Sequence, residues 1–156
     1  MQDRFKFRYV FSKDFDGKTG ICYKMPIFNL DTITDENFNK IVKGYTDYGY
    51  KLISIDQSTG LKDENGKLIY EGDILDLYVS SEKLYRYEVK YEIGSFMLVS
   101  DDEIFDFKNV WNDNVYPLSQ LYWEYQNEEN CIYQCEVIGN IYDNPELLKG
   151  DNNGKD

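Results

Sequence analysis

Short runs of β-branched and aromatic residues recur along the chain, separated by segments rich in Gly, Asp and Asn. Such runs are typical of β-strands, because branched and aromatic side chains suit a half-buried pleated surface. The pattern predicts strands over residues 4–11, 21–28, 50–56, 74–79, 85–92 and 95–100. Asp16-Gly17 predicts a hairpin loop between the first two strands, and residues 92–95 predict a turn between the last two.

One segment, TDENFNKIVKGY, carries a helical pattern instead. Its apolar residues follow the spacing i, i+3, i+4 and i+7, and they are Phe38, Ile41, Val42 and Tyr45. This spacing predicts an amphipathic helix over residues 35–43, with Thr34 as N-cap and Gly44 at its end. We expect the stripe to face the core, because a single helix in a β protein usually covers a sheet face or a barrel end. A helix that docks in a partner's groove would show the same spacing.

The last third of the chain gives a weaker signal. Asn144-Pro145 predicts a short helix over residues 144–148, since Pro is favoured at the first helical position. Residues 119–133 fit a helix or a strand, and residues 150–156 predict a frayed tail. A length of 156 residues indicates one domain. The pattern therefore predicts a mainly β fold, α+β at the margin, with one amphipathic helix and a short C-terminal helix.

The window from residue 58 to residue 75, STGLKDENGKLIYEGDIL, contains two predicted turns. Asn65-Gly66 and Gly72 suit left-handed backbone positions, which glycine and asparagine adopt at little cost. The carboxylates of Asp63 and Asp73 can accept hydrogen bonds from turn N–H groups. We therefore interpret this window as architecture rather than as a site for chemistry.

The same window resembles the YopX-like family of phage and prophage proteins. The middle motif T-G-L-x-D-x-x-G-x-x-I-Y-E-G-D-I and the late motif V-I-G-N-I-Y-x-N-P-E-L carry the resemblance, together with the start FKFR. The fingerprint residues are Gly60, Asp63, Gly66, Tyr70, Gly72, Asp73, Gly139 and Pro145. After KFR the family usually continues with a small residue and Trp, whereas this chain has Tyr9 and Val10.

The resemblance implies a β-rich fold with a small, open, antiparallel, barrel-like sheet, and a phage or prophage origin in a bacterial cytoplasm. It implies a single domain over residues 1–149. Residues 31–49 look like a helical insertion into a shorter family core, and residues 122–135 look like a second addition. The family supplies no catalytic residues that could be transferred to this chain.

The charge balance excludes several classes of partner. The 17 basic and 29 acidic side chains give a formal charge of −12, so phosphate backbones and anionic membranes should be repelled. The basic cluster Arg4, Lys6 and Arg8 is too short to hold a duplex, and we interpret it as the solvated face of the first strand. No run of about 18 apolar residues and no signal peptide are present, which predicts a soluble, cytosolic protein.

The residues that usually carry catalysis or bind metals are sparse. The chain has no histidine, which is the commonest general base. Cys22, Cys131 and Cys135 predict free thiols, and the C-x-x-x-C pair lacks the further ligands of a closed zinc site. The acidic cluster Asp101, Asp102, Glu103 and Asp106 resembles a Mg²⁺ site, but a nuclease would also need a cationic track. We therefore predict no enzyme activity, metal or cofactor.

Protein binding remains as the main hypothesis. An acidic, aromatic-rich surface could occupy the nucleic-acid site of a host enzyme, such as a defence nuclease, because its carboxylates would stand in for phosphates. The acidic candidates are Asp101, Asp102, Glu103, Asp106, Glu124, Glu128 and Glu129, and the aromatic anchors are Tyr122, Trp123 and Tyr125. Alternatively, the acidity only keeps an aromatic-rich protein soluble.

Self-assembly is a further hypothesis, because exposed strand edges in a small β protein invite pairing. In residues 84–92, Tyr85, Tyr87, Val89 and Tyr91 alternate with charged side chains, as expected of a sheet with one wet face. The aromatic face would contact either the core or a second copy of the chain. A homo-oligomeric phage component without a host target is therefore the alternative function.

Overall fold

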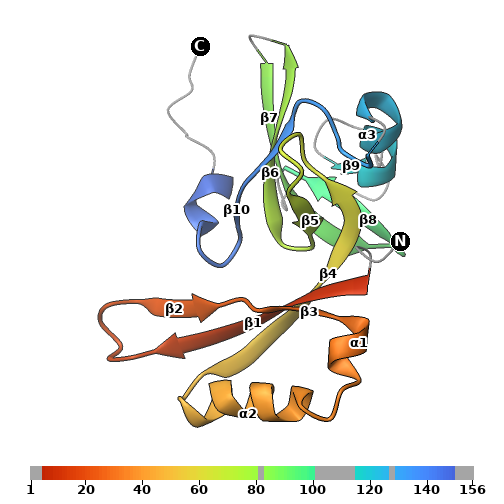
Figure 1. The fold of residues 1–156 in the computed structure, drawn as a ribbon. Helices are drawn as coiled ribbons and strands as arrows, with labels where there is room; N and C mark the ends of the chain where they lie inside the picture. The colour runs from red at the N-terminus through yellow and green to blue at the C-terminus, as the bar shows by residue number, and fades with distance from the viewer. Residues whose placement is uncertain (1–4, 81–82, 101–114, 127–128, 150–156) are drawn as a thin grey trace. The chain divides into compact units, whose positions relative to one another are not determined.

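A computed structural model of the chain describes residues 5–80, 83–100, 115–126 and 129–149 (Figure 1). The fold is mainly β, as predicted: two antiparallel sheets, one a curled half-barrel, with three short α-helices. The chain divides into two compact units, Met1–Gly60 and Leu61–Asp156.

The sheet of the first unit is built around β1 (Lys6–Asp14). This strand pairs antiparallel with β2 (Ile21–Lys24), β3 (Ile27–Asn29) and β4 (Lys51–Lys62). The predicted strand over 21–28 is thus two strands in one register, interrupted at Pro26, which has no N–H to donate. The Pro26 carbonyl still accepts a hydrogen bond from the Tyr9 N–H at 2.9 Å. The predicted hairpin loop is confirmed, with the Gly17 N–H donating to Asp14 at 2.7 Å.

The helical segment begins later and ends later than predicted. Asn29 accepts a hydrogen bond from the Thr32 N–H at 2.8 Å and caps a separate short helix, α1 (Leu30–Ile33), so that Thr34 is the C-cap of α1 rather than an N-cap. The amphipathic helix α2 (Phe38–Asp47) follows and contains Gly44 instead of ending there. The helix ends at Asp47 with Tyr48 as its C-cap, and Gly49 follows with a left-handed φ of 87°.

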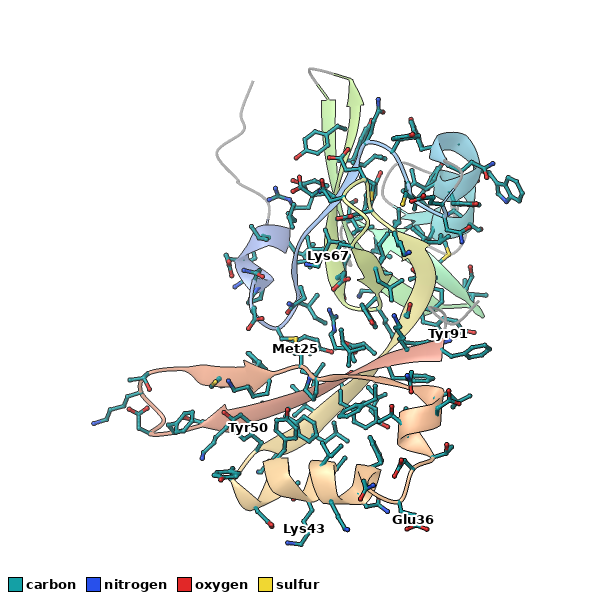
Figure 2. All side chains as sticks on the ribbon, in the orientation of Figure 1. Met25, Glu36, Lys43, Tyr50, Lys67 and Tyr91 are labelled. Carbon is teal, nitrogen blue, oxygen red and sulfur yellow. The ribbon has the colours of Figure 1, made fainter. Side chains whose placement is uncertain are left out.

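Aromatic side chains fill the space between α2 and the sheet (Figure 2). Phe38, Val42 and Tyr45 pack against buried Tyr9, Phe11 and Phe28, which confirms the core-facing stripe. The Phe11 and Tyr45 rings stack with centroids 4.5 Å apart. Ile41 departs from the prediction: it is 40% exposed, and it lines a hollow of about 270 Å³ on the side of α2.

Arg8 is not on a solvated face, contrary to the sequence interpretation. It is 8% exposed, and its Nη2 lies 3.0 Å from Asp56 Oδ2. The two residues are register partners on β1 and β4, and Ser54 also donates to Asp56 at 2.7 Å. A buried guanidinium needs such a partner, because desolvating an unpaired charge is costly. Arg4 lies outside the described residues.

The second unit contains a five-stranded antiparallel sheet in the order β10-β6-β7-β8-β9. Its strands are β6 (Asp73–Ser80), β7 (Lys83–Glu92), β8 (Ser95–Val99), β9 (Val115–Pro117) and β10 (Cys135–Asn140). The short strand β5 (Leu68–Tyr70) is not part of this sheet. It follows β4 in the sheet whose strand order is β2-β1-β4-β5. The turn predicted over 92–95 joins β7 and β8, with positive φ at Ile93 and Gly94.

Residues 119–133, left open by the sequence, form a helix and then two bridges. Helix α3 (Leu118–Tyr125) buries Leu118 and Leu121 against the core of this unit. Isolated bridges then pair Gln126 with Ile132 and Lys62 with Cys131. The predicted C-terminal helix is the 3-10 helix η4 (Pro145–Leu148), and the predicted tail over 150–156 lies outside the described residues.

The charged face of β7 is partly buried rather than fully exposed to solvent. Arg86 donates to the two carboxylate oxygens of Asp76 at 2.7 and 3.0 Å, and Asp76 is only 4% exposed. Arg86 also donates to the Leu147 carbonyl of η4 at 3.4 Å. On the other face of β7, Tyr87 and Val89 belong to the core, as the alternation predicts.

Candidate functional site

The two family motifs meet at the buried carboxylate of Asp63. Its Oδ1 accepts hydrogen bonds from the Asn65 and Lys67 N–H groups, and its Oδ2 accepts one from the Val137 N–H, all at 2.9 Å. The side chain is 1% exposed. Three backbone donors occupy most of the roughly four acceptor sites of this buried carboxylate, so Asp63 holds the turn and β10 together and is not accessible to a ligand.

The other fingerprint residues also have conformational roles. Asp73 accepts a hydrogen bond from the Tyr70 N–H at 2.8 Å, and Gly60, Gly66 and Gly72 all have φ near 80°. Beside η4, a methyl group at Gly139 would overlap the Asn144 side chain, with only 2.8 Å to its Cγ. Pro145 occupies the first turn of η4. These contacts fix the backbone, so the fingerprint residues have structural roles.

The aromatic candidates lie on α3, where they face different surroundings. Trp123 is 71% exposed, whereas Tyr122 and Tyr125 pack against the core cluster. The Tyr122 hydroxyl donates to Asn130 at 3.2 Å, and its ring meets the Trp123 ring edge-on at 5.8 Å. Trp123 is therefore the exposed one of these three aromatic side chains.

The acidic candidates are only partly within the described residues. Glu124 and Glu129 are exposed. Asp101, Asp102, Glu103, Asp106 and Glu128 lie outside the described residues, so their part in protein binding stays a prediction.

A hollow of about 220 Å³, the tyrosine pocket, lies between α3 and the sheet. Its walls carry four tyrosines, which are Tyr85, Tyr87, Tyr116 and Tyr125. Leu77 and Leu121 complete the apolar lining, and both are buried. Within the part of the chain that the structure describes, Glu124 is the one charged residue of the lining. β6, β7, β9 and α3 all contribute, so distant parts of the second unit build this pocket.

Two polar groups of the tyrosine pocket, the Tyr116 hydroxyl and the Glu124 carboxylate, interact with each other. Burial raises the pKa of the Tyr116 hydroxyl well above its usual range, and a hydrogen bond to Glu124 and the charge of Glu124 raise it further. Gln120 donates to Glu124 at 3.2 Å from the preceding turn of α3. The negative charge of the Glu124 carboxylate therefore lies beside a mostly aromatic wall.

Sequence reasoning identified Glu124 and Tyr125 but missed the other walls of the pocket. Tyr85 and Tyr87 share one face of β7, and their rings lie 14° from parallel with centroids 6.2 Å apart. Their alternation was visible in the sequence, but it also fits an ordinary core face. Tyr116 comes from a three-residue strand that no sequence pattern predicted.

The thiols and carboxylates of the described residues offer no metal centre. Within residues 5–80, 83–100, 115–126 and 129–149, no three His, Cys, Asp or Glu side chains gather closely enough to hold a metal ion. Cys22, Cys131 and Cys135 form no disulfide; Cys131 and Cys135 are buried, and Cys22 is half-buried. Likewise, none of the helices in these residues is long and apolar enough to cross a membrane.

A comparison with protein families agrees with the motifs. A family model described as YopX protein matches residues 20–149. Among solved structures, the crystal structure of protein EF1440 from Enterococcus faecalis is similar, with 27% sequence identity and a TM-score of 0.35. That similarity covers 89% of this chain and 74% of the other. No curated protein matches the chain.

Proposed function

Because the chain belongs to the YopX family, we propose that it is a phage or prophage accessory protein that acts by binding another protein and not by catalysis. The proposed target is a nucleic-acid-processing or defence enzyme of the bacterial host, which the protein inhibits in the cytoplasm. The surface that carries the interaction is acidic and rich in aromatic side chains. No direct contact with nucleic acid or membrane is part of this function.

The exposure of Trp123 next to Glu124 on α3 is the observation that carries the proposal. An indole that is 71% exposed leaves a large apolar area in water, and tryptophan is among the residues that dominate binding energy at protein interfaces. Tyr122 supports this ring from the side, so the anchor is partly preorganised.

The charge of the chain supports the choice of target. With a formal charge of −12, the protein is attracted to basic surfaces and repelled by nucleic acid. The surface of an enzyme that binds DNA or RNA is basic where the phosphates lie, at about one charge per 1.7 Å of duplex. An acidic protein that docks there would exclude the substrate.

The proposal is tested by capture and by competition. Tagged protein is incubated with a bacterial host lysate, eluted in rising salt and analysed by mass spectrometry, and each captured nucleic-acid enzyme is then assayed with its substrate. We expect release at moderate salt, because exposed charges are screened within about 10 Å at 0.1 M. Inhibition should be relieved by excess DNA or RNA.

Two variants make the test specific. The first replaces the acidic cluster (Asp101→Asn, Asp102→Asn, Glu103→Gln, Asp106→Asn), and the second is Trp123→Ala. Each should weaken binding at least tenfold if the acidic, aromatic surface is the interface. Unchanged affinity in both variants, or capture without inhibition, would contradict the proposal.

One observation favours the alternative, a homo-oligomeric phage component without a host target. Leu52, Ile53 and Ile55 of β4 are 40–49% exposed, and exposed apolar strand residues invite pairing between copies. Native mass spectrometry separates the two functions, because an assembly appears at a multiple of 18.5 kDa. Capture of the protein alone, at such a multiple, would retire the inhibitor proposal.

A further inference from the structure

The tyrosine pocket has the composition of a receptor for an organic cation. The negative faces of aromatic rings attract ammonium and guanidinium groups, and a cluster of such rings forms a cage around them. Tyr85 and Tyr87 present two nearly parallel rings on β7, and Tyr116 and Tyr125 add rings from β9 and α3. We propose that this pocket binds the side chain of an arginine or lysine that belongs to the partner protein.

Charge selects a cation over a neutral ligand. Among the lining residues that the structure describes, Glu124 is the one charged residue and none is basic. Glu124 is exposed, so its carboxylate can meet the charged end of an incoming side chain while water still reaches it. The hydroxyl of Tyr116 keeps its proton, because burial and the charge of Glu124 raise its pKa.

Size and depth favour a side chain over a larger ligand. Drug-sized and cofactor ligands usually fill about 300–1,000 Å³, and this pocket holds about 220 Å³. The buried side chains of Leu77, Tyr87 and Leu121 can contact the methylene groups of the incoming side chain. Arginine and lysine combine such an apolar stem with a charged end.

This inference rests on the proposed function, since it names the group that a basic partner surface would insert. The two can nevertheless fail separately. The pocket is tested with peptides alone, without any host protein, whereas the proposed function is tested by capture and inhibition. Trp123 does not line the pocket, so Trp123→Ala should affect capture and leave peptide binding unchanged.

The experiment titrates the ¹⁵N-labelled full chain with three probes and follows the amide resonances of residues 77, 85–87 and 116–125. The probes are acetyl-Gly-Arg-Gly-amide, the same peptide with neutral citrulline, and agmatine as a free cation. We expect the arginine peptide to bind about five- to tenfold more tightly than the citrulline peptide. It should also bind more tightly than agmatine, because the peptide backbone adds contacts.

Matched variants locate the site. Glu124→Gln and Tyr85→Leu should each weaken arginine-peptide binding about two- to fivefold, whereas Tyr85→Phe, which keeps the ring, should not. Glu146→Gln removes a carboxylate that does not line the pocket and serves as the charge control. If Tyr85→Leu does not fold, Glu124→Gln and a lysine peptide compared with a norleucine peptide test the same inference.

Three results would overturn the inference. The first is equal binding of the arginine and citrulline peptides. The second is a set of shifts outside the pocket residues. The third is tighter binding of agmatine, which would make the pocket a site for a small free cation instead of a protein side chain.

Discussion

The buried carboxylate of Asp63 joins two segments of the second unit that are 74 residues apart in the sequence. In Asp63→Asn, one oxygen becomes an NH₂ group that faces a backbone N–H, so at least one buried donor loses its acceptor. Hydrogen bonds to charged groups contribute about 1.5–3 kcal/mol, and an unsatisfied donor adds to the loss. We expect the free energy of unfolding to fall by about 2–4 kcal/mol.

Urea unfolding followed by tryptophan fluorescence measures this loss in the second unit, because Trp123 lies there and residues 1–60 contain no tryptophan. Asp143→Asn is the control, since the Asp143 carboxylate belongs to the same unit and accepts a hydrogen bond from Asn140 at 3.4 Å, but is exposed. A smaller effect for Asp63→Asn than for Asp143→Asn would show that burial of Asp63 is not what matters.

The cysteines should differ in reactivity according to burial. Burial, and then the charges of Asp63 and Glu64, raises the pKa of Cys135 to about 12. Its thiolate, which is the reactive form, is therefore scarce at pH 8. Cys131 is buried as well, whereas Cys22 is half-buried. A thiol reagent should modify one thiol rapidly in the native protein and three in denaturant, and mass spectrometry of peptides should place the first at Cys22.

The raised pKa of Cys135 also determines whether the free energy of unfolding rises or falls with pH. The folded state holds the thiol proton more tightly than the unfolded state, where the pKa is near 9.0. The stabilisation is present in full below pH 9 and is lost as the pH rises toward 12. The difference in unfolding free energy between wild type and Cys135→Ala should therefore shrink from pH 8 to pH 10.5. A constant difference would contradict the assignment.

Whether a methyl group added at a glycine stabilises the fold depends on the backbone conformation at that position. A Cβ at Gly44 would meet nothing within 4 Å, and the residue is inside the helix, so Gly44→Ala should stabilise the first unit by about 0.5–1 kcal/mol. Gly17 in the β1–β2 loop also has open space, but its φ is 66°. Gly17→Ala should therefore destabilise by about 1–2 kcal/mol. Calorimetry of both variants tests the pair, and effects of equal sign would contradict it.

The elements themselves were largely predictable, and the errors lie at their ends. The stripe of Phe38, Val42 and Tyr45 predicted α2 correctly, because periodicity reports which face is buried. The N-cap was wrong because Asn29 captures the Thr32 N–H and starts a separate turn. Periodicity also does not register that Pro26 cannot donate to β1.

The candidate site was much harder to predict than the elements. Leu77 and Tyr125 line one pocket from opposite ends of a 49-residue stretch, and only the strand order brings them together. The short strand β9, which carries Tyr116, is three residues long and has no alternation to detect. The sequence predicts Glu124 and Tyr125 on a protein-binding surface, and the fold also places both in the wall of the pocket.

The formal charge of −12 acts on the molecule as a whole. Net charge of this size destabilises a compact state through self-repulsion, whereas exposed pairs such as Lys43–Asp47 contribute little. The Debye length falls from about 30 Å at 0.01 M salt to about 8 Å at 0.15 M. Added salt therefore screens the long-range repulsion more than it weakens close attraction.

We accordingly expect the melting temperature to rise when NaCl increases from 0.01 to 0.15 M. A gain of about 1 kcal/mol corresponds to roughly 2–4 °C for a chain of this size. Calorimetry at both salt concentrations measures the shift, and sucrose at matched osmolality controls for effects that do not involve charge. A melting temperature that falls with salt would mean that attractive pairs, such as Arg86–Asp76, outweigh the net repulsion. In that case the net negative charge would not destabilise the fold, and a benefit to solubility would be enough to explain the acidic composition.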